Sequence, residues 1–296
     1  MKLRRTLLYV PGNNPNMMAD CMIYGADVIL FDLEDSVPLQ EKDAARYLVE
    51  YALRYLDFSN TEVAIRINGM DTPYWEEDIK KIIPEKPDMI RLPKAETKEQ
   101  IKRLDEEISK IEEKSGIKVG NTKIMVSIES AKGLKNAYDI ATASIRLQAI
   151  AIGGEDFTAD LGVKKTREGN ELLVARGVLV LAAKAAKVDV IDSVFSDVND
   201  EEGFRMETEK AKAMGFTGKS VINPRQIPIV HDVFKPTEEE IQEAIKITQV
   251  IEEAKKKGSG VISLNGKMVD KPIVEKAERV LELAKTLGLV EKVAAC

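Results

Sequence analysis

The chain has 296 residues, 44% of them hydrophobic and 32% charged, so it can bury a large core and is not disordered. Its formal net charge is -6 at pH 7 and it has no long basic run, which argues against nucleic acid as a partner. No apolar stretch approaches the roughly 20 residues that a membrane span requires, so no membrane contact is expected.

Cysteine and histidine are scarce. Cys21 and Cys296 lie near opposite ends, and the first five residues lack a signal-peptide core, so we expect a reducing cytoplasm. The single histidine, His231, follows apolar residues and is interpreted as a packing or helix-surface residue. Carboxylates, lysine or tyrosine must then carry proton transfer.

Eight short runs rich in β-branched residues recur along the chain, with helix-patterned segments between them. The runs are residues 6–10, 28–32, 62–68, 89–93, 123–129, 149–153, 190–194 and 216–222. Helical spacing marks residues 41–56, 98–114, 169–186 and 200–214. This pattern predicts an α/β fold, a (β/α)₈ TIM barrel, which typically needs ~250 residues. A doubly wound sheet is the alternative, but no GxGxxG motif follows the first strand.

The pattern changes after Pro224, where a long charged helix is expected at 237–257 and another at 272–287. We therefore divide the chain into a barrel domain, residues 1–230, and a C-terminal helical extension, residues 231–296. Between the two helices, apolar residues alternate around an expected Asn265-Gly266 turn.

Polar residues follow several predicted strands, and barrel enzymes place their catalytic groups at these strand ends. The residues are Asp32, Glu34 and Asp35 after strand two, Arg66 and Asn68 on strand three, Arg91 and Lys94 after strand four, Glu129 after strand five, and Gly153, Gly154, Glu155 and Asp156 after strand six. Carboxylates without histidine or cysteine suit Mg²⁺ or Mn²⁺. Glu129 and Asp156 are the predicted metal ligands, although Asp156 or Asp35 could instead cap a helix.

Arg66 interrupts an apolar strand, where an unpaired charge would be costly, so it requires an anionic partner. That partner is either a structural carboxylate or a substrate carboxylate held by the guanidinium fork. The glycines before Glu155 form either a tight turn or a close approach to a ligand. We expect Gly154, Glu155 and Asp156 to contact substrate together with Arg66 and Glu129.

Motifs across nearly the whole chain resemble the HpcH/HpaI aldolase and citrate lyase β family. They are RTLLYVPG (5–12), FDLEDSV (31–37), EKDAAR (41–46), RIN (66–68), RLPK (91–94), IES (128–130), GED (154–156), GKSVINPRQI (218–227) and LNGKMVD (264–270). Asn223 and the segment SDVNDEEGF (196–204) favour the citrate lyase β group over the related malyl-CoA and β-methylmalyl-CoA lyases.

The resemblance implies a Mg²⁺-dependent retro-Claisen cleavage of a citryl thioester into oxaloacetate and an acetyl thioester. It further implies that Glu129 and Asp156 bind the metal, that Arg66 contacts the oxaloacetate portion, and that Glu34 and Asp35 support them from behind. Asp270 would enter a neighbouring subunit's site and protonate the enolate, or it could simply cap a helix. Arg5, Lys42 and Arg46 are tentative contacts for the thioester carrier.

The same resemblance implies a citrate lyase α subunit and an acyl carrier protein as partners, with self-association through the extension. Three alternatives stay open: a stand-alone malyl-CoA-type lyase or thioesterase, a Schiff-base aldolase that uses Lys94, and a noncatalytic scaffold subunit.

Overall fold

The computed structural model describes residues 2–59, 61–257, 263–264 and 267–290. Within these residues the chain divides into two compact units, and the larger is Arg4–Phe234. The second unit contains the described residues from Lys235 onward and the short segment before Arg4. This boundary lies close to the sequence-based division of the chain after residue 230.

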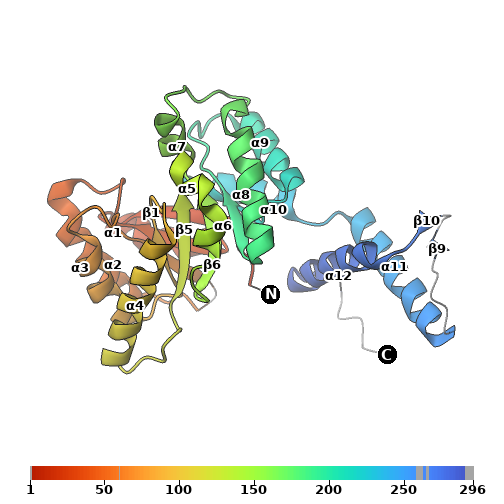
Figure 1. Ribbon diagram of the computed structural model, residues 1–296, viewed down its shortest axis with the longest axis horizontal. Coiled ribbons are helices and arrows are strands. Elements are labelled where there is room, and N and C mark those ends of the chain that lie inside the picture. Colours follow the sequence, from red (N-terminus) through yellow and green to blue (C-terminus); the bar gives the residue numbers. More distant parts are fainter. Residues whose placement is uncertain (1, 60, 258–262, 265–266, 291–296) are drawn as a thin grey trace. The chain divides into compact units, whose positions relative to one another are not determined.

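The larger unit is a closed parallel barrel of eight strands in chain order (Figure 1). The strands are β1 (Thr6–Pro11), β2 (Val28–Asp32), β3 (Glu62–Arg66), β4 (Met89–Leu92), β5 (Lys123–Ile128), β6 (Leu147–Ile152), β7 (Asp189–Asp192) and β8 (Gly218–Val221). Pairing of Leu7 on β1 with Ser220 on β8 closes the sheet. The predicted TIM barrel is thus confirmed, and the open doubly wound sheet is wrong.

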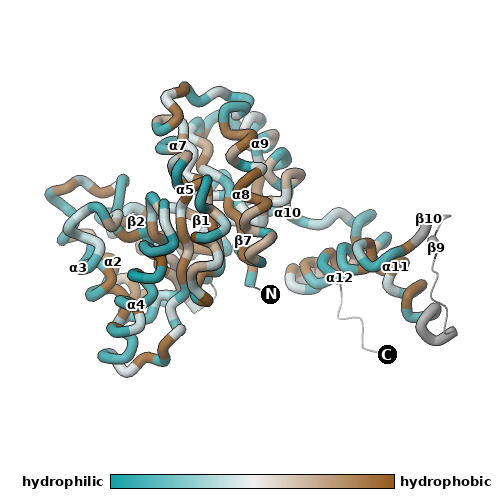
Figure 2. The backbone as a smooth tube through the Cα atoms, viewed as in Figure 1, coloured by the Kyte–Doolittle hydropathy of each residue, from teal (hydrophilic) through white to brown (hydrophobic). Residues whose placement is uncertain are grey.

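Helices cover the outside of the barrel. They are α1 (Pro15–Asp20), α2 (Lys42–Tyr55), α3 (Trp75–Ile82), α4 (Lys98–Lys114), α5 (Ala131–Lys135), α6 (Ala137–Ala141), α7 (Gly154–Asp160), α8 (Leu173–Ala186), α9 (Glu201–Met214) and α10 (Gln226–Phe234). Short 3₁₀ turns occupy Cys21–Tyr24, Leu39–Glu41, Ile83–Glu85 and Asn170–Leu172. Hydrophobic and hydrophilic segments alternate along these helices (Figure 2), because only one side of each packs on the sheet.

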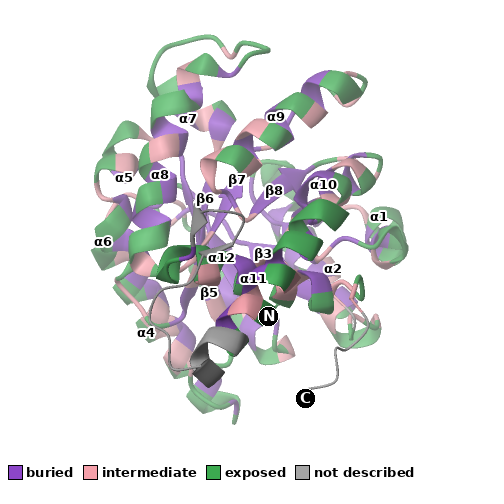
Figure 3. Cartoon of the chain, turned by 90° about the vertical axis from the view of Figure 1, so that its right-hand side faces the viewer, coloured by how far each residue is buried: buried purple, intermediate pink, exposed green. Residues whose placement is uncertain are grey.

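The strands of the barrel are largely buried (Figure 3), and their side chains alternate between two cores. One set of side chains packs beneath the helices, and the other set fills the barrel interior, where Leu7, Leu30, Ala64, Met89 and Ile191 form an apolar floor. Because the side-chain period of a strand is two residues, the next inward position after each floor residue lies nearer the C-terminal end of the strand. These positions build the site described below.

The second unit contains α11 (Glu238–Lys257), α12 (Lys271–Thr286) and a small antiparallel pair, β9 (Ser263–Leu264) with β10 (Lys267–Met268). Ala244, Ile247, Val269 and Ala277 form a separate small core between the two helices. The two predicted helices are confirmed, and the expected Asn265-Gly266 turn lies outside the described residues. Among the described helices, none has the length and apolarity needed to cross a membrane.

His231 lies on α10 and is partly buried, with its Nε2 3.0 Å from the Thr6 Oγ1 at the start of β1. Burial, assisted by Arg5, lowers the pKa of His231. The residue is far from the carboxyl ends of the strands, so its interpretation as a packing histidine is confirmed.

A buried ionic cluster links β7 and β8 to the helices outside them. Lys219 Nζ contacts Asp192 Oδ2 at 2.8 Å and Glu207 Oε1 at 2.7 Å, and Arg176 Nε contacts Asp192 Oδ1 at 2.8 Å. All four side chains are at least 90% buried. Burial by itself would raise the pKa of Asp192, but Lys219 and Arg176 outweigh it and hold that pKa below its ordinary value.

We expect Asp192→Asn to lower the free energy of unfolding by about 3 kcal/mol or more, because it leaves two buried cations undercompensated. Urea denaturation at pH 7 measures this loss. The folded-state pKa is depressed, so the contribution of Asp192 is complete above the unfolded-state value of about 4 and declines as the pH falls below it.

The exposed Glu77–Lys80 pair on α3 supplies the control. Glu77→Gln should change stability little at any pH, because water screens that pair. Equal losses for both variants would contradict the special role of the buried cluster.

Candidate active site

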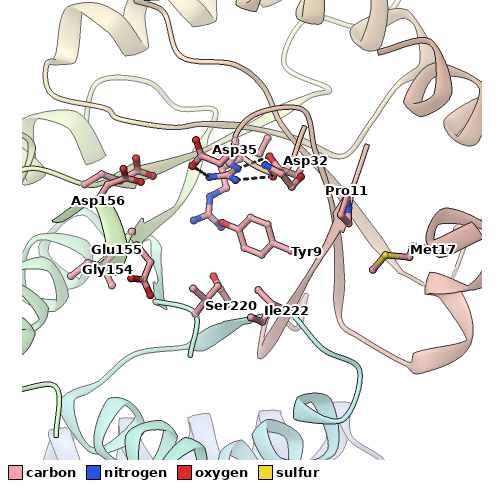
Figure 4. A pocket seen from close by; sticks show the side chains of 17 residues that line it. Tyr9, Pro11, Met17, Asp32, Asp35, Gly154, Glu155, Asp156, Ser220 and Ile222 are labelled. Carbon is pink, nitrogen blue, oxygen red and sulfur yellow. Dashed lines mark hydrogen bonds and ion pairs between the residues drawn. The ribbon is translucent and has the colours of Figure 1, made fainter. Parts of the chain in front are cut away.

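Inward-facing polar side chains meet at the carboxyl ends of the strands, where they line a cavity of about 410 Å³. Tyr9, Asp32, Arg66 and Arg91 each follow an apolar floor residue by two positions, and Ser220 of β8 lines the same cavity. Glu129 follows β5 directly. Figure 4 shows Tyr9 at the centre of the cavity, Asp32 and Asp35 on one side and Glu155 and Asp156 on another. The predicted convergence of strand-end groups on one mouth is confirmed.

Arg66 is held by carboxylates of the β2 strand end. Its Nε and Nη2 donate to the two oxygens of Asp32, each at 2.7 Å. Its Nη1 lies 2.6 Å from Glu34 Oε2 and 3.4 Å from Asp35 Oδ2. The structural carboxylate that we considered as its partner is therefore Asp32, which occupies the side of the fork that a bidentate substrate contact would use. Each nitrogen of this guanidinium therefore lies near a carboxylate of the β2 strand end.

This cluster shifts the pKa of both carboxylates. Burial opposes ionisation of Asp32, but Arg66 and the backbone amide of Glu34 keep the pKa of Asp32 below its ordinary value. Burial raises the pKa of Glu34 to about 7, and the nearby charges of Glu129 and Asp35 add to this shift while Arg66 opposes it. Asp32 and Arg66 are thus a fixed ion pair, whereas Glu34 is poised near neutral pH.

Glu129 is 4% exposed, and its Oε2 has no hydrogen-bond partner among the described residues. Burial, together with the charge of Asp156, raises the pKa of its carboxyl. A buried carboxylate oxygen without a hydrogen-bond partner is costly to desolvate, so its presence indicates that a ligand binds there. A cation fits this need, because it would satisfy Oε2 and stabilise the ionised form.

Gly153 makes the position of Glu129 possible. A Cβ at residue 153 would lie 2.5 Å from Glu129 Cγ and 2.9 Å from its Oε1. Gly154 is equally confined, since a Cβ there would lie 2.5 Å from Ser193 Oγ. Neither glycine has a positive φ, so close packing and not a tight turn explains the pair.

Asp156 lies in the first turn of α7 and lines the same cavity as Glu129. No side chain caps α7, whose N-cap is Gly153, so the cap interpretation of Asp156 is wrong. Glu155 reaches sideways, where its Oε1 accepts from Lys165 at 2.7 Å and from Ser196 at 2.6 Å. Glu129 and Asp156 also line a neighbouring cavity of about 300 Å³, so they stand between two spaces.

The described residues contain no cluster of three or more His, Cys, Asp or Glu side chains arranged to hold a metal. Two carboxylates that share a cavity nevertheless match Mg²⁺, which usually takes one or two protein carboxylates and completes its octahedron with water and substrate oxygens.

Two tentative carrier residues are buried and engaged elsewhere. Lys42 Nζ donates to the carbonyls of Leu33 and Glu34, at 2.7 and 2.6 Å, and so fixes the loop after β2. Arg46 donates to Asp78 at 2.8 Å, which in turn accepts from Asn68. Both residues support the site from outside the cavity, and neither lines it.

Arg5 is also misplaced as a carrier contact at this mouth. It precedes β1, at the amino ends of the strands, and pairs with both oxygens of Asp27 at 2.8 Å. The carboxyl ends that carry the cavity lie at the other end of the barrel.

Asp270 is the N-cap of α12, where its Oδ1 accepts from the Ile273 amide at 3.2 Å. The helix cap that we gave as its alternative is therefore present. The side chain is exposed, so capping leaves its proposed catalytic role untested.

Sequence reasoning did not select Tyr9, and it named Arg91 and Lys94 at the end of strand four without assigning them a binding role in the main interpretation. Tyr9 lies between two guanidinium groups, with its ring centroid 5.1 Å from Arg66 Cζ and 5.3 Å from Arg91 Cζ. Lys94 adopts a left-handed backbone with φ 50° and places its Nζ 3.0 Å from Glu34 Oε1. The alternation of inward positions was the available signal for Tyr9 and Arg91.

Comparison with known proteins places these features in a wider group. Residues 5–224 match the family described as HpcH/HpaI aldolase/citrate lyase. The citrate lyase subunit beta of Leuconostoc mesenteroides subsp. cremoris is 51% identical over 290 residues, covering 98% of this chain and 96% of the relative. The L-malyl-CoA/beta-methylmalyl-CoA lyase of Rhodobacter capsulatus is 32% identical, covering 96% and 95%.

A solved structure shows the same architecture. The CitE protein of Mycobacterium tuberculosis, in complex with magnesium, acetoacetate and coenzyme A, matches with a TM-score of 0.77 and 28% identity. The match covers 96% of this chain and 98% of that one.

The close approach of residue 153 to Glu129 gives a test of the cation site. We expect Gly153→Ala to displace the Glu129 carboxylate and to weaken Mg²⁺ binding roughly 10-fold or more, as measured by isothermal titration calorimetry. Gly177→Ala is the matched control, because a Cβ there meets nothing within 4 Å on α8. Unchanged Mg²⁺ affinity in Gly153→Ala would exclude Glu129 as a ligand.

Proposed function

Because this chain belongs to the HpcH/HpaI aldolase/citrate lyase family, we propose that it cleaves a citryl thioester into oxaloacetate and an acetyl thioester. It is a carbon–carbon lyase of the citrate lyase β type. The observation that carries the proposal is the pairing of Glu129, whose buried Oε2 is orphaned, with Asp156 in a cavity that also holds two buried arginines.

Glu129 and Asp156 would hold Mg²⁺, and Mn²⁺ would suit the same oxygen ligands. The bound ion would supply Lewis acidity and a template for the hydroxyl and adjacent carboxylate of the citryl group. Gly153 keeps the Glu129 carboxylate in place, and Gly154 leaves room for substrate beside Asp156. Glu155, joined to Lys165 and Ser196, would shape the wall of the substrate site.

Arg66 would act on the substrate through Nη1, which also contacts Glu34 and Asp35, since Asp32 holds its other two nitrogens. The tertiary hydroxyl gives up its proton to a base, its carbon becomes a ketone and the adjacent carbon–carbon bond breaks; the α-carbon of the acetyl thioester takes up one proton in return, so protons balance over the whole reaction. Nη1 is placed to stabilise negative charge on the oxygen as it changes from alkoxide to carbonyl. Glu34 and Asp35 hold this guanidinium in position from behind.

Cleavage leaves the electron pair on the α-carbon of the acetyl thioester, and this enolate must gain a proton. We assign that role to Asp270 of a second copy of the chain. The exposed position of Asp270 at the head of α12 suits a group that completes a neighbour's site. Self-association is therefore part of the proposal.

The similar relatives are named as subunits, which implies a multi-subunit assembly. We propose a citrate lyase α subunit and an acyl carrier protein as its other components. Arg5, Lys42 and Arg46 are not needed for the carrier in this proposal, because each is paired within the barrel. The cytoplasmic location expected from the sequence stays a prediction.

The alternatives are less well supported. The malyl-type relative is 32% identical against 51% for the citrate lyase relative, so a malyl thioester lyase is the second candidate. A Schiff base at Lys94 requires a neutral amine, yet ion pairing with Glu34 outweighs burial and raises the pKa of Lys94. A noncatalytic scaffold does not explain an orphaned glutamate in a polar cavity.

The metal-site assignment predicts that Glu129→Gln lowers the rate of citryl-CoA cleavage roughly 100-fold or more, because the variant loses an anionic ligand. Oxaloacetate release with Mg²⁺ measures the rate, EDTA should abolish it, and the exposed Glu77→Gln serves as control. Full activity in EDTA, or cleavage of malyl-CoA alone, would contradict the assignment.

The role of Asp270 predicts a kcat decrease of roughly 100-fold or more in Asp270→Asn. Asparagine caps a helix as well as aspartate, so the fold of the extension should persist. Mixing inactive Asp270→Asn with inactive Glu129→Gln should restore part of the activity, because mixed assemblies contain one intact site. No recovery would place Asp270 in the site of its own chain, and undiminished kcat would reduce it to a cap.

A further inference from the structure

The cavity contains two buried arginines whose partners differ. Arg66 is surrounded by the carboxylates of Asp32, Glu34 and Asp35. Arg91 is 2% exposed and forms no ion pair with a carboxylate among the described residues, and its Nη1 has no hydrogen-bond partner there. A buried guanidinium without a counter-charge is costly, so this position requires an anion from elsewhere.

The surroundings hold Arg91 in one orientation. It is the inward residue of β4, next in register to Arg66 of β3. Its Nε donates to Ser127 Oγ on β5 at 2.8 Å, and the ring of Tyr9 lies 5.3 Å from its Cζ. These contacts use one nitrogen and one face of the guanidinium, and they leave Nη1 and Nη2 without a protein acceptor. Both nitrogens belong to a residue that lines the cavity.

Arg176 shows what a structural arginine looks like in this chain. It is as buried as Arg91, at 1% exposure, and its Nη1 likewise has no hydrogen-bond partner among the described residues, but it pairs with Asp192 and Glu207 at 2.8 and 3.0 Å. The barrel thus provides carboxylates for a buried guanidinium where stability requires them. Arg91 has no such ion pair, although its charge acts on the nearby Glu129 carboxylate, and its unpartnered Nη1 points to a further anionic ligand.

The substrate of the proposed reaction has two carboxylates. One is attached to the carbinol carbon and belongs with the hydroxyl at the Glu129 and Asp156 end of the cavity. The other lies on the methylene arm and becomes the distal carboxylate of oxaloacetate. A planar guanidinium fork matches a carboxylate better than any other side chain does.

We propose that Arg91 binds the carboxylate of the methylene arm and thereby makes the site selective for citryl over substrates that lack this group. Ser127 orients the guanidinium, and the Tyr9 ring supports its face. The inference rests on the proposed lyase function and adds its specificity determinant. Arg91 does not contact the bond that breaks in this proposal, so its loss should affect substrates that carry the arm carboxylate far more than substrates that lack it.

Two thioesters that differ in the methylene-arm carboxylate can isolate the contribution of this group to binding. Citramalyl-CoA carries a methyl group where citryl-CoA carries the carboxymethyl arm, and both undergo the same cleavage. We expect Arg91→Met to lower kcat/KM for citryl-CoA roughly 10- to 100-fold, the value of a charge-assisted hydrogen bond. The kcat/KM for citramalyl-CoA should fall much less, so the ratio of the two kcat/KM values is the quantity that decides. Arg91→Lys should recover part of the loss, because it restores charge without the fork.

Stability separates this role from a structural one. The ligand-free Arg91→Met variant should melt at the same temperature as the wild type or higher, because an uncompensated buried charge has been removed. Arg176→Met, which breaks paired contacts, should melt lower. Equal losses of kcat/KM for both thioesters, or no loss for citryl-CoA, would overturn the proposal.

A failure of the proposed function gives a different result. If the wild type cleaves citramalyl-CoA but not citryl-CoA, both the function and the role of Arg91 are wrong. If it cleaves neither, calorimetric titration with Mg²⁺ and freshly prepared oxaloacetate or pyruvate still tests Arg91. The wild type should prefer oxaloacetate, and Arg91→Met should lose that preference; an equal preference in both proteins would overturn the inference.

Discussion

The alternation of side chains along the eight strands is the constraint on which the rest of this molecule depends. Each strand sends every second residue into the barrel, so an apolar residue at one inward position fixes the direction of the residue two places later. Met89 precedes Arg91, Leu30 precedes Asp32 and Leu7 precedes Tyr9 in this way. The floor of the barrel and the chemistry at its mouth are therefore set by a single periodicity.

The same alternation separates two kinds of buried charge. Outward positions on β7 and β8 carry Asp192 and Lys219, which meet the cations and anions of α8 and α9 and satisfy one another. Inward positions carry polar side chains that are not all paired. Among the described residues, Glu129 Oε2 and Arg91 Nη1 have no hydrogen-bond partner. One cluster is paired within the fold, and in our proposal a cation and an anionic substrate complete the other.

The shifted pKa values of the carboxylates in the mouth follow from these missing partners. Asp32 and Arg66 form a fixed pair, while burial and repulsion from neighbouring carboxylates raise the pKa of Glu34 and Glu129 against the opposing charge of Arg66. A cation near Glu129 would reverse that trend by favouring its charged form. Preorganised charges of this kind stabilise developing charge without having to reorient during the reaction.

The sequence by itself determined the barrel, the order of its strands, the two helices of the extension and the convergence of Asp35, Arg66, Glu129 and Asp156 on one mouth. Periodicity and strand ends are local properties, so they can be read from the sequence alone. Only the tertiary structure decided which charges pair. The tertiary structure pairs Asp32 with Arg66 and places Lys42 and Arg46 behind the site. It also places Arg5 at the opposite end of the barrel and leaves Arg91 without a carboxylate ion pair. Pairing depends on register and on distances between residues far apart in the chain, and neither is visible in composition or spacing.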